Sequence, residues 1–511
     1  MLRNCRRAQR PANWVVSLID VSRQLDSKPI VNAPRPSLLR SARMWTTRLI
    51  QPVNQMAGRV RRFASSSHLL KGVARDVSWI GGGTICSRLL GLVSTVYIAR
   101  WLGVDGFGRY SMILATLGTL GVFAGAGLGI TATKFIAENG VKNVRRTGQI
   151  LGLIFLSSVA TGIGITIIAF LLAPWISSQV LADPTLLYPL RVSTALIFFN
   201  TINGVQLGAL AGFQAFKGVA VVSLCATIIT AAFSIIGAYA GGLVGTCAGV
   251  TLAAAVNCVV THAGLRAQIR WRKIRLSFSG ILQNRHILLS FSLPSLLSGL
   301  LVDPVNWLCA AMVVHQSGNY HQMGAYYAAN QWMTALLFLP GLVANVVFPR
   351  LSQAVAQLGR SDALNIMALN IGINAAATIP FALALSLASG AIMGLYGPEL
   401  SSEWQILIFT LIAAALMAMA SPLGTVIAAS GRMWIGMTLN VAWAASFIVF
   451  TVLLLGYGAL GLAIARAGAY VLHVGWSSGY VVWLVRLLPE SRLNHAALPL
   501  ASEDDHPQLS S

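Results

Sequence analysis

Charged residues are scarce in this 511-residue sequence, and acidic residues are scarcer still. Asp, Glu, Lys and Arg make up only 10% of the residues, with 14 acids against 36 Lys and Arg. A soluble domain carries about a quarter charged residues, because water must solvate its surface. With 56% hydrophobic residues and a mean hydropathy of +0.71, this chain has too little polar material for several soluble domains. A soluble globular protein is therefore excluded.

The sequence also lacks two enzyme motifs and any cysteine spacing typical of a disulfide framework or a metal site. The sequence contains neither the phosphate-binding run GxxxxGK[ST] nor the zinc-protease run HExxH. Its six cysteines form no CxxC pair, and five of them lie inside apolar segments, where cysteine behaves as a small hydrophobic residue. We therefore expect a protein that is not an enzyme, hydrolyses no ATP and needs neither a cofactor nor a metal.

What the sequence has in abundance is apolar runs of about 20 residues, the length of a helix that crosses about 30 Å of hydrocarbon. The runs predict an all-α, polytopic membrane protein with about twelve transmembrane helices. The predicted spans are 78–101, 110–133, 149–173, 188–213, 219–240, 243–265, 287–315, 326–347, 364–395, 404–428, 433–455 and 460–485.

The basic residues fall on alternate loops, which predicts the orientation of the spans. Loops on the side of the amino-terminal tail carry Lys134, Lys217 and Arg432, and also the basic stretch from Arg266 to Arg285. The opposite loops contain a single basic residue, Arg109. Both termini are therefore expected in the cytoplasm. The acids of the opposite loops include Asp105, Asp183, Glu399 and Glu403.

Residues 1–77 form a basic tail that holds 15 of the 36 Lys and Arg residues and three acids. We interpret it as a disordered cytoplasmic extension that lies near anionic lipid headgroups. An organellar transit peptide, suggested by the stretch 59–67, and a start codon placed too far upstream are alternatives. Nucleic acid is not an expected partner, because no recognition motif accompanies the charge. The predicted organisation continues with a six-helix lobe at 78–265, a basic cytoplasmic linker at 266–286, a second six-helix lobe at 287–486 and a cytoplasmic tail at 487–511.

The two predicted lobes share weak internal similarity. Gly108 precedes span two and Gly324 precedes span eight, an offset of 216 residues. Gly242 and Gly458 stand at the same offset before spans six and twelve. Because six spans is an even number, both lobes would face the same way, related by an axis along the membrane normal with a cavity between them. This parallel repeat is typical of secondary transporters.

Several short motifs carry a resemblance to a known family, over roughly residues 75–486. The sequence is similar to bacterial polysaccharide and O-antigen flippases of the multidrug/oligosaccharidyl-lipid/polysaccharide (MOP) exporter superfamily. The resemblance implies two lobes around a V-shaped cavity. It also implies translocation of a polyprenyl-pyrophosphate-linked oligosaccharide across the cytoplasmic (inner) membrane of a bacterial cell. The motifs are Arg88-Leu-Leu-Gly-Leu-Val, Ala99-Arg-Trp-Leu-Gly103, Gly106-Phe-Gly-Arg-Tyr110, Phe291-Ser-Leu-Pro294, Gly324-Ala-Tyr-Tyr-Ala-Ala329, Phe348-Pro-Arg-Leu351 and Tyr396-Gly397.

Three charged residues fall well inside predicted spans: Arg88, Asp303 and Arg466. A charge at that depth costs about 2.5–3.5 kcal/mol on insertion scales, so it is expected to face a cavity or a partner. We predict that Arg88 binds the diphosphate and that Asp303 binds the coupling ion, a proton or sodium. A salt bridge between Arg88 and Asp303 that joins the lobes is the alternative. Arg466 is either a substrate-binding residue or an arginine that reaches the interface.

Span four carries three amides, Asn200, Asn203 and Gln206, on one side of the helix. They are candidate substrate-binding residues, since amides hydrogen-bond sugar hydroxyls. Amides also join helices within membranes, and that interpretation stays open.

The sequence thus predicts a flippase for an O-antigen or exopolysaccharide repeat unit that works by alternating access. Its expected partners are the lipid-linked oligosaccharide, membrane lipids, a coupling ion and polysaccharide assembly proteins. A cation-coupled drug antiporter and a lipid II flippase of the same superfamily are alternatives. A membrane scaffold that transports nothing is a further alternative.

Overall fold

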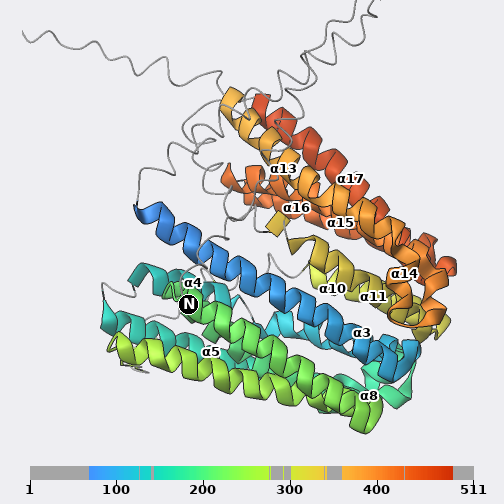
Figure 1. Ribbon diagram of the computed structural model, residues 1–511, viewed down its shortest axis with the longest axis horizontal. Helices are drawn as coiled ribbons and strands as arrows, with labels where there is room; N and C mark the ends of the chain where they lie inside the picture. Colours follow the sequence, from blue (N-terminus) through green and yellow to red (C-terminus); the bar gives the residue numbers. More distant parts are fainter. Residues whose placement is uncertain are drawn as a thin grey trace, which may run out of the picture. The chain divides into compact units, whose positions relative to one another are not determined.

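In the computed structural model, the residues that the structure describes are almost all helical and include no strand (Figure 1). They are residues 68–125, 127–139, 143–275, 277, 292, 301–338, 340–341, 360–430 and 432–486. Most of the tail 1–77, part of the linker 266–286 and the tail 487–511 lie outside them. The motif at 348–351 lies outside them too, and so does the motif at 291–294 except for Ser292. Residues 1–75 and 76–511 are separate units, and the contacts below belong to the second.

The first half of the chain contains two long helices that bend at glycines, together with shorter helices between them. Glycines bend the two longest of them where the sequence predicts a turn between spans, because their backbone angles are not helical. The bends lie at Gly103 (φ 70°, ψ 167°) and at Gly241 and Gly242. The helices are α3 (His68–Gly125), α4 (Leu128–Asn139), α5 (Val144–Trp175), α6 (Leu187–Ser193), α7 (Ala195–Gly212) and α8 (Phe216–Trp271).

The second half repeats this helical pattern. Gly318 ends α10 in the left-handed conformation (φ 60°), and the Asn319 side chain then accepts a hydrogen bond from the Gln322 amide, which starts α11. The helices are α10 (Val302–Ser317), α11 (Tyr320–Leu336), α13 (Arg360–Leu387), α14 (Ser389–Gly394), α15 (Trp404–Ala429), α16 (Met433–Leu453) and α17 (Gly458–Arg486).

Eight helices of the described residues are long and apolar enough to cross a membrane. Two of them, Ile85–Gly125 and Phe216–Trp271, contain the glycine bends, and the second covers two predicted spans. The first covers the predicted span one from Ile85 on and the predicted span two only as far as Gly125, because the helix ends there and α4 begins at Leu128. α10 and α11 occupy the described parts of the predicted seventh and eighth spans. The chain is therefore an all-α, multi-pass membrane protein, as its apolar runs predict.

The helices pack in two groups. α4 to α8 contact one another, and α10 to α17 contact one another; α13, α15 and α17 run side by side (Figure 1). We call these groups the N-terminal and C-terminal lobes. Each has a hydrophobic cluster of its own, around Ile150 in the first and Leu423 in the second. A larger cluster, which includes Phe107 and Tyr326, joins α3 to both lobes.

Backbone geometry agrees with the predicted repeat. Gly242 has φ 54° and ψ −134°, and Gly458, 216 residues later, has φ 57° and ψ −132°. This conformation is open to glycine and strained for other residues, so both positions need glycine for the same reason.

The repeat-related glycines Gly108 and Gly324 lie where α3 meets α11. A Cβ on Gly108 would overlap the Tyr320 carbonyl oxygen, and a Cβ on Gly324 would overlap the Val104 carbonyl oxygen. The offset of 216 relates Val104 to Tyr320 as it relates Gly108 to Gly324. The two contacts are therefore copies of each other, as expected for a contact across a two-fold axis.

Polar contacts reinforce this end of the lobes. Arg109 lies 3.4 Å from Asp183 and 3.3 Å from Asp105, and its guanidinium stands over the Tyr320 ring. The Tyr320 hydroxyl donates to the Leu181 carbonyl oxygen (2.6 Å). All of these residues lie on the side predicted to face away from the cytoplasm, so the structure joins the lobes at that end.

Replacing Gly458 with Ala should destabilise the protein more than replacing Gly242 with Ala. Both substitutions force a side chain into a sparsely populated backbone conformation, at about 1–3 kcal/mol. At Gly458 the new Cβ would also displace the Gln322 side chain, which accepts a hydrogen bond from the Ala459 amide (3.2 Å). Nothing lies within 4 Å of a Cβ at Gly242. Thermal unfolding in detergent measures the difference, and equal midpoints for the two variants would contradict it.

Candidate functional site

Four helices surround a cavity of about 290 Å³ that contains Arg466, which we call the Arg466 cavity. α3, α10 and α11 each contribute residues three or four apart, a spacing that places them on one helical face, and α17 contributes one residue. The cavity lies between α3 and the C-terminal lobe. The contributions are Ala115, Gly118 and Thr119 from α3, Asp303, Asn306 and Trp307 from α10, Tyr326, Tyr327, Asn330 and Met333 from α11, and Arg466 from α17.

Arg466 is the dominant charge of this cavity. Its side chain is 6% exposed, and no other Lys, Arg, Asp or Glu among the described residues is buried. The guanidinium donates to Asn330 Oδ1 (2.8 Å) and to the Tyr326 hydroxyl (3.4 Å), while its Nε has no partner. Among the described residues no carboxylate forms an ion pair with it. Two neutral groups thus hold a buried cation in place and leave its charge uncompensated.

Asp303 lines the same cavity from the first turn of α10. The positive end of a helix dipole favours a carboxylate at that position. Its side chain is exposed rather than enclosed by neighbours. The structure therefore places one predicted site residue, Asp303, in one cavity with another, Arg466.

Arg88 is exposed on α3 and lines neither of the cavities described here. It forms no ion pair with Asp303, so the alternative of a salt bridge joining the lobes does not apply to this conformation. The diphosphate-binding role of Arg88 stays a prediction.

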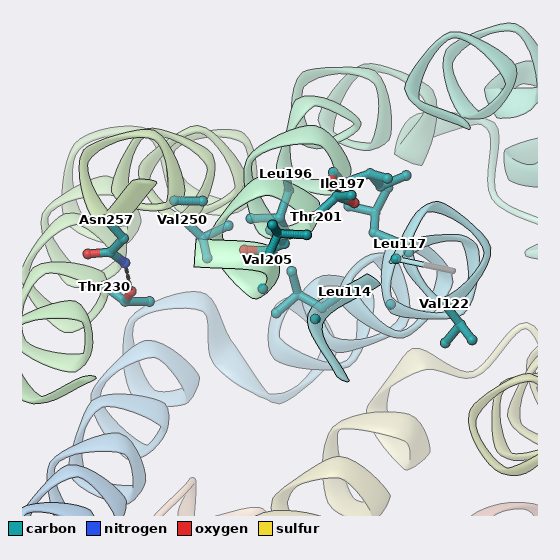
Figure 2. A pocket seen from close by; sticks show the side chains of 17 residues that line it. Leu114, Leu117, Val122, Leu196, Ile197, Thr201, Val205, Thr230, Val250 and Asn257 are labelled. Atoms are coloured by element: carbon teal, nitrogen blue, oxygen red, sulfur yellow. Dashed lines mark hydrogen bonds between the residues drawn. The ribbon is translucent and has the colours of Figure 1, made fainter. Parts of the chain in front are cut away.

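A second cavity, of about 580 Å³, lies between α3 and the N-terminal lobe, and we call it the Asn257 cavity (Figure 2). Figure 2 shows apolar side chains of α3 and α7 around it and a hydrogen-bonded pair on α8. In this pair Asn257 donates to Thr230 Oγ1 (3.1 Å) across the bend of α8. Asn257 is 7% exposed, and its Oδ1 has no hydrogen-bond partner among the described residues. Gly118 lines both cavities.

The three predicted amides of span four separate in the structure. Asn200 is exposed and lines the Asn257 cavity. Gln206 is buried and donates to Cys258 Sγ (3.8 Å) on α8, which fits the role of an amide that joins helices. Asn203 is half-buried and lines neither cavity.

Sequence reasoning missed the polar partners in both cavities. Asn257 is the only Asn of its predicted span, so its isolation in an apolar run was a usable signal. Asn330 and Tyr326 carried no such signal, because α11 contains many polar and aromatic residues. Only tertiary packing shows that both contact Arg466.

One sequence pattern has no catalytic meaning here. Gly475-Trp-Ser-Ser-Gly479 fits the spacing GxSxG of a nucleophile elbow. That motif needs a sharp turn between a strand and a helix. In this protein the run lies inside α17, and Ser477 is buried.

Curated relatives are similar in sequence to part of this chain, and two of them come from different bacteria. The polysaccharide export inner membrane protein EpsE of Ralstonia nicotianae is 27% identical over 37% of this chain and 44% of its own length. Stage V sporulation protein B of Bacillus subtilis is 26% identical over 53% of this chain and 56% of its own length. The chain therefore matches about half of the length of these relatives.

Solved structures share the fold over most of the chain. The lipid II flippase MurJ, in an inward closed conformation, superimposes with a TM-score of 0.63 at 16% identity, over 80% of this chain and 87% of that one. An inward-facing MATE multidrug transporter of the MOP superfamily gives 0.61 at 15% identity, over 78% and 96%. Residues 73–355, just over half of the sequence, match the family described as "Polysaccharide biosynthesis protein". The chain thus belongs to the polysaccharide biosynthesis protein family and has the fold of MOP-superfamily transporters.

Proposed function

We propose that this protein is a flippase for a polyprenyl-diphosphate-linked oligosaccharide, an O-antigen or exopolysaccharide repeat unit. It would work by alternating access in the bacterial cytoplasmic membrane, with both termini in the cytoplasm. The observation that carries the proposal is a buried arginine that forms no ion pair with an acid among the described residues, in a cavity of a member of a polysaccharide biosynthesis family. The curated relative named for EPS I polysaccharide export supports the same class of cargo.

The electrostatic argument concerns what Arg466 attracts. A buried charge without a counter-charge is costly, so the site gains free energy when an anion enters. A planar guanidinium suits the oxygen atoms of a phosphate group, which it binds through two parallel hydrogen bonds. The diphosphate is the charged part of a polyprenyl-linked sugar, so this group is the one that we assign to the Arg466 cavity.

Reconstituted protein tests the function directly. Vesicles would carry a short-chain polyprenyl diphosphate bearing a fluorescent disaccharide, and an impermeant reagent would report the share of probe in each leaflet. We expect translocation of this probe and none of ethidium, an organic cation. Movement of ethidium without the glycolipid would establish the drug-antiporter alternative and contradict the proposal.

A test in cells is also available. Deleting the gene from its source organism should trap lipid-linked repeat units in the cytoplasmic leaflet, because the later steps of assembly occur on the other side. The measurement is the accumulation of these lipids together with the amount of surface glycan. An unchanged surface glycan would reject the proposed cargo.

Asp303 offers a physical route to coupling with an ion gradient. The carboxylate shares the Arg466 cavity and repels a diphosphate that enters it. Binding of a proton or sodium ion removes the repulsion, so cation and cargo should favour each other's binding. Replacing Asp303 with Asn should therefore strengthen binding of farnesyl diphosphate, used as a probe, and make translocation independent of an imposed gradient. A D303N variant that still accelerates with the gradient would rule out this role.

The alternative functions differ in the charge that the cavity would carry and in whether the protein needs charges within the membrane. A drug antiporter for cations would not place an unpaired arginine in its cavity, and a scaffold would need no intramembrane charge. A lipid II flippase would share the anion site, and it is distinguished by offering lipid II and a non-peptide glycolipid in the same vesicles. Contacts with polysaccharide assembly proteins remain part of the proposal and can be sought by cross-linking in cells.

A further inference from the structure

The two cavities are related in part by the internal repeat. The offset of 216 that relates Gly242 to Gly458 also relates Leu114 to Asn330 and Val250 to Arg466. Leu114 and Val250 line the Asn257 cavity, and their counterparts line the Arg466 cavity. A third pair, Leu117 and Met333, follows the same rule. Three repeat-related pairs of residues thus line the two cavities, with one member of each pair in each cavity.

The chemistry of the two cavities differs. Arg466 and Asn330 stand where the Asn257 cavity has Val250 and Leu114. None of the described residues that line the Asn257 cavity is charged, whereas both Asp303 and Arg466 line the Arg466 cavity. The uncharged cavity is also the larger, about 580 Å³ against 290 Å³. A ligand that fills both cavities would need a small anionic part and a bulkier neutral part.

The lining of the Asn257 cavity mixes apolar surface with hydrogen-bonding groups. Asn200, Thr201, Thr230 and Asn257 supply amides and hydroxyls. A cargo's hydrocarbon chain would bury these groups without hydrogen bonds, which is unfavourable. The hydroxyls of a sugar can pair with them, and the CH faces of its ring can pack on leucine and valine side chains.

Glycines make room for such a ligand along α3. Gly118, Gly121 and Gly125 are three and four residues apart, so they share one face, and all three line the cavity. A Cβ built on any of them would meet nothing within 4 Å. The space at these Cβ positions is therefore open, and a larger side chain there would extend into the cavity.

We propose that the Asn257 cavity binds the uncharged sugar rings of the cargo while the Arg466 cavity binds its diphosphate. Gly118 lines both cavities, so the linkage between sugar and diphosphate would lie beside α3 at this residue. This inference rests on the proposed function, because it divides one cargo between two sites. It assigns sugar recognition to the N-terminal lobe and charge recognition to the C-terminal lobe.

Binding of two kinds of probe to the full-length purified protein tests the division. The bare probe is farnesyl diphosphate, and the glycosylated probes are the same lipid carrying glucose, galactose or N-acetylglucosamine. At least one of the sugars should tighten binding by about tenfold, because it adds contacts in the Asn257 cavity. Absence of a gain for all three sugars would overturn the proposal.

The Gly121→Leu variant provides the sharpest test, because Gly121 lines the cavity and a Cβ there meets no described atom within 4 Å, so the new side chain extends into the cavity. It should abolish the gain from the sugar and leave binding of the bare probe unchanged. Gly164→Leu is the matched control, since Gly164 also lies within a helix, has no neighbour within 4 Å of a Cβ and does not line the cavity. A gain that persists in Gly121→Leu, or an equal loss for both probes, would overturn the division.

Two further variants separate this inference from the proposed function. Asn200→Leu removes an exposed amide and should also reduce the gain from the sugar. Arg466→Met should weaken the bare and the glycosylated probes by the same factor. If Arg466→Met left binding of both probes unchanged, the assignment of the diphosphate to the Arg466 cavity would fail. The sugar-binding role of the Asn257 cavity would still be tested independently, by the gain in affinity from the sugar and its loss in Gly121→Leu.

Discussion

Replacing Arg466 with Met is expected to reduce translocation of the diphosphate-linked probe by about ten- to a hundredfold without loss of stability. A hydrogen bond to a charged group contributes about 1.5–3 kcal/mol, and each 1.4 kcal/mol corresponds to a factor of ten. Met keeps a similar apolar stem and removes the charge. Because Arg466 has no acidic partner among the described residues, its removal leaves no carboxylate buried alone. The thermal unfolding midpoint should therefore stay the same or rise.

The test is specific because translocation should fall while the unfolding midpoint stays the same or rises. A purely structural arginine would lose transport and stability together, so a much lower midpoint in Arg466→Met would contradict the anion-binding role. Arg466→Lys should fall between the wild type and Arg466→Met, because an ammonium keeps the charge but not the planar pair of donors. Arg486→Met is the control, since Arg486 is exposed at the end of the same helix.

Replacing Gly108 with Val is expected to separate the lobes at their joined end and to reduce translocation at least about tenfold. The new side chain would overlap the Tyr320 carbonyl oxygen, which belongs to the backbone of α11 and cannot turn away. Because packed interfaces switch between discrete arrangements rather than deform gradually, the lobes should favour the separated state. Gly324→Val should act in the same way, since it makes the equivalent contact with Val104.

Spin labels at Trp101 and Leu395 can measure this separation, in a variant whose six native cysteines are replaced. Both side chains are exposed, and the adjacent Arg100 donates to the Leu395 carbonyl oxygen (2.7 Å), so the labels report the distance between α3 and the C-terminal lobe. Longer distances are expected in both valine variants. Gly479→Val, in an open position on α17, is the control and should leave the distances unchanged. Wild-type distances in Gly108→Val would contradict the predicted opening.

The membrane spans could be predicted from the sequence because their physical cause is local. A run of apolar residues must be helical in a bilayer, whatever packs against it, since each backbone group needs a hydrogen bond within its own helix. The glycine bends were also local, and Gly242 and Gly458 adopt the conformation that only glycine accepts without strain. Fold class, repeat and family resemblance therefore all followed from the order of residues.

The site was harder to predict, because a charged residue in an apolar run shows only that a polar environment exists nearby. Arg88 and Arg466 looked alike in this respect, yet Arg88 is exposed outside both cavities and Arg466 is buried beside one. The neighbours that distinguish them, Asn330 and Tyr326, are more than 130 residues away from Arg466 in the chain.

By itself, the sequence determined that this is a two-fold repeated bundle of membrane helices with a few charged residues inside its spans, where burial of a charge is unfavourable. Hydrophobic length, basic loops and glycine turns act over one helix or one turn, so they can be recognised without knowing the neighbours. Only the tertiary structure decided which charge lies in a cavity, which amides line it and which glycines join the lobes. Those properties depend on helix faces that meet across the repeat, and the same residues would have other roles if the helices were rotated.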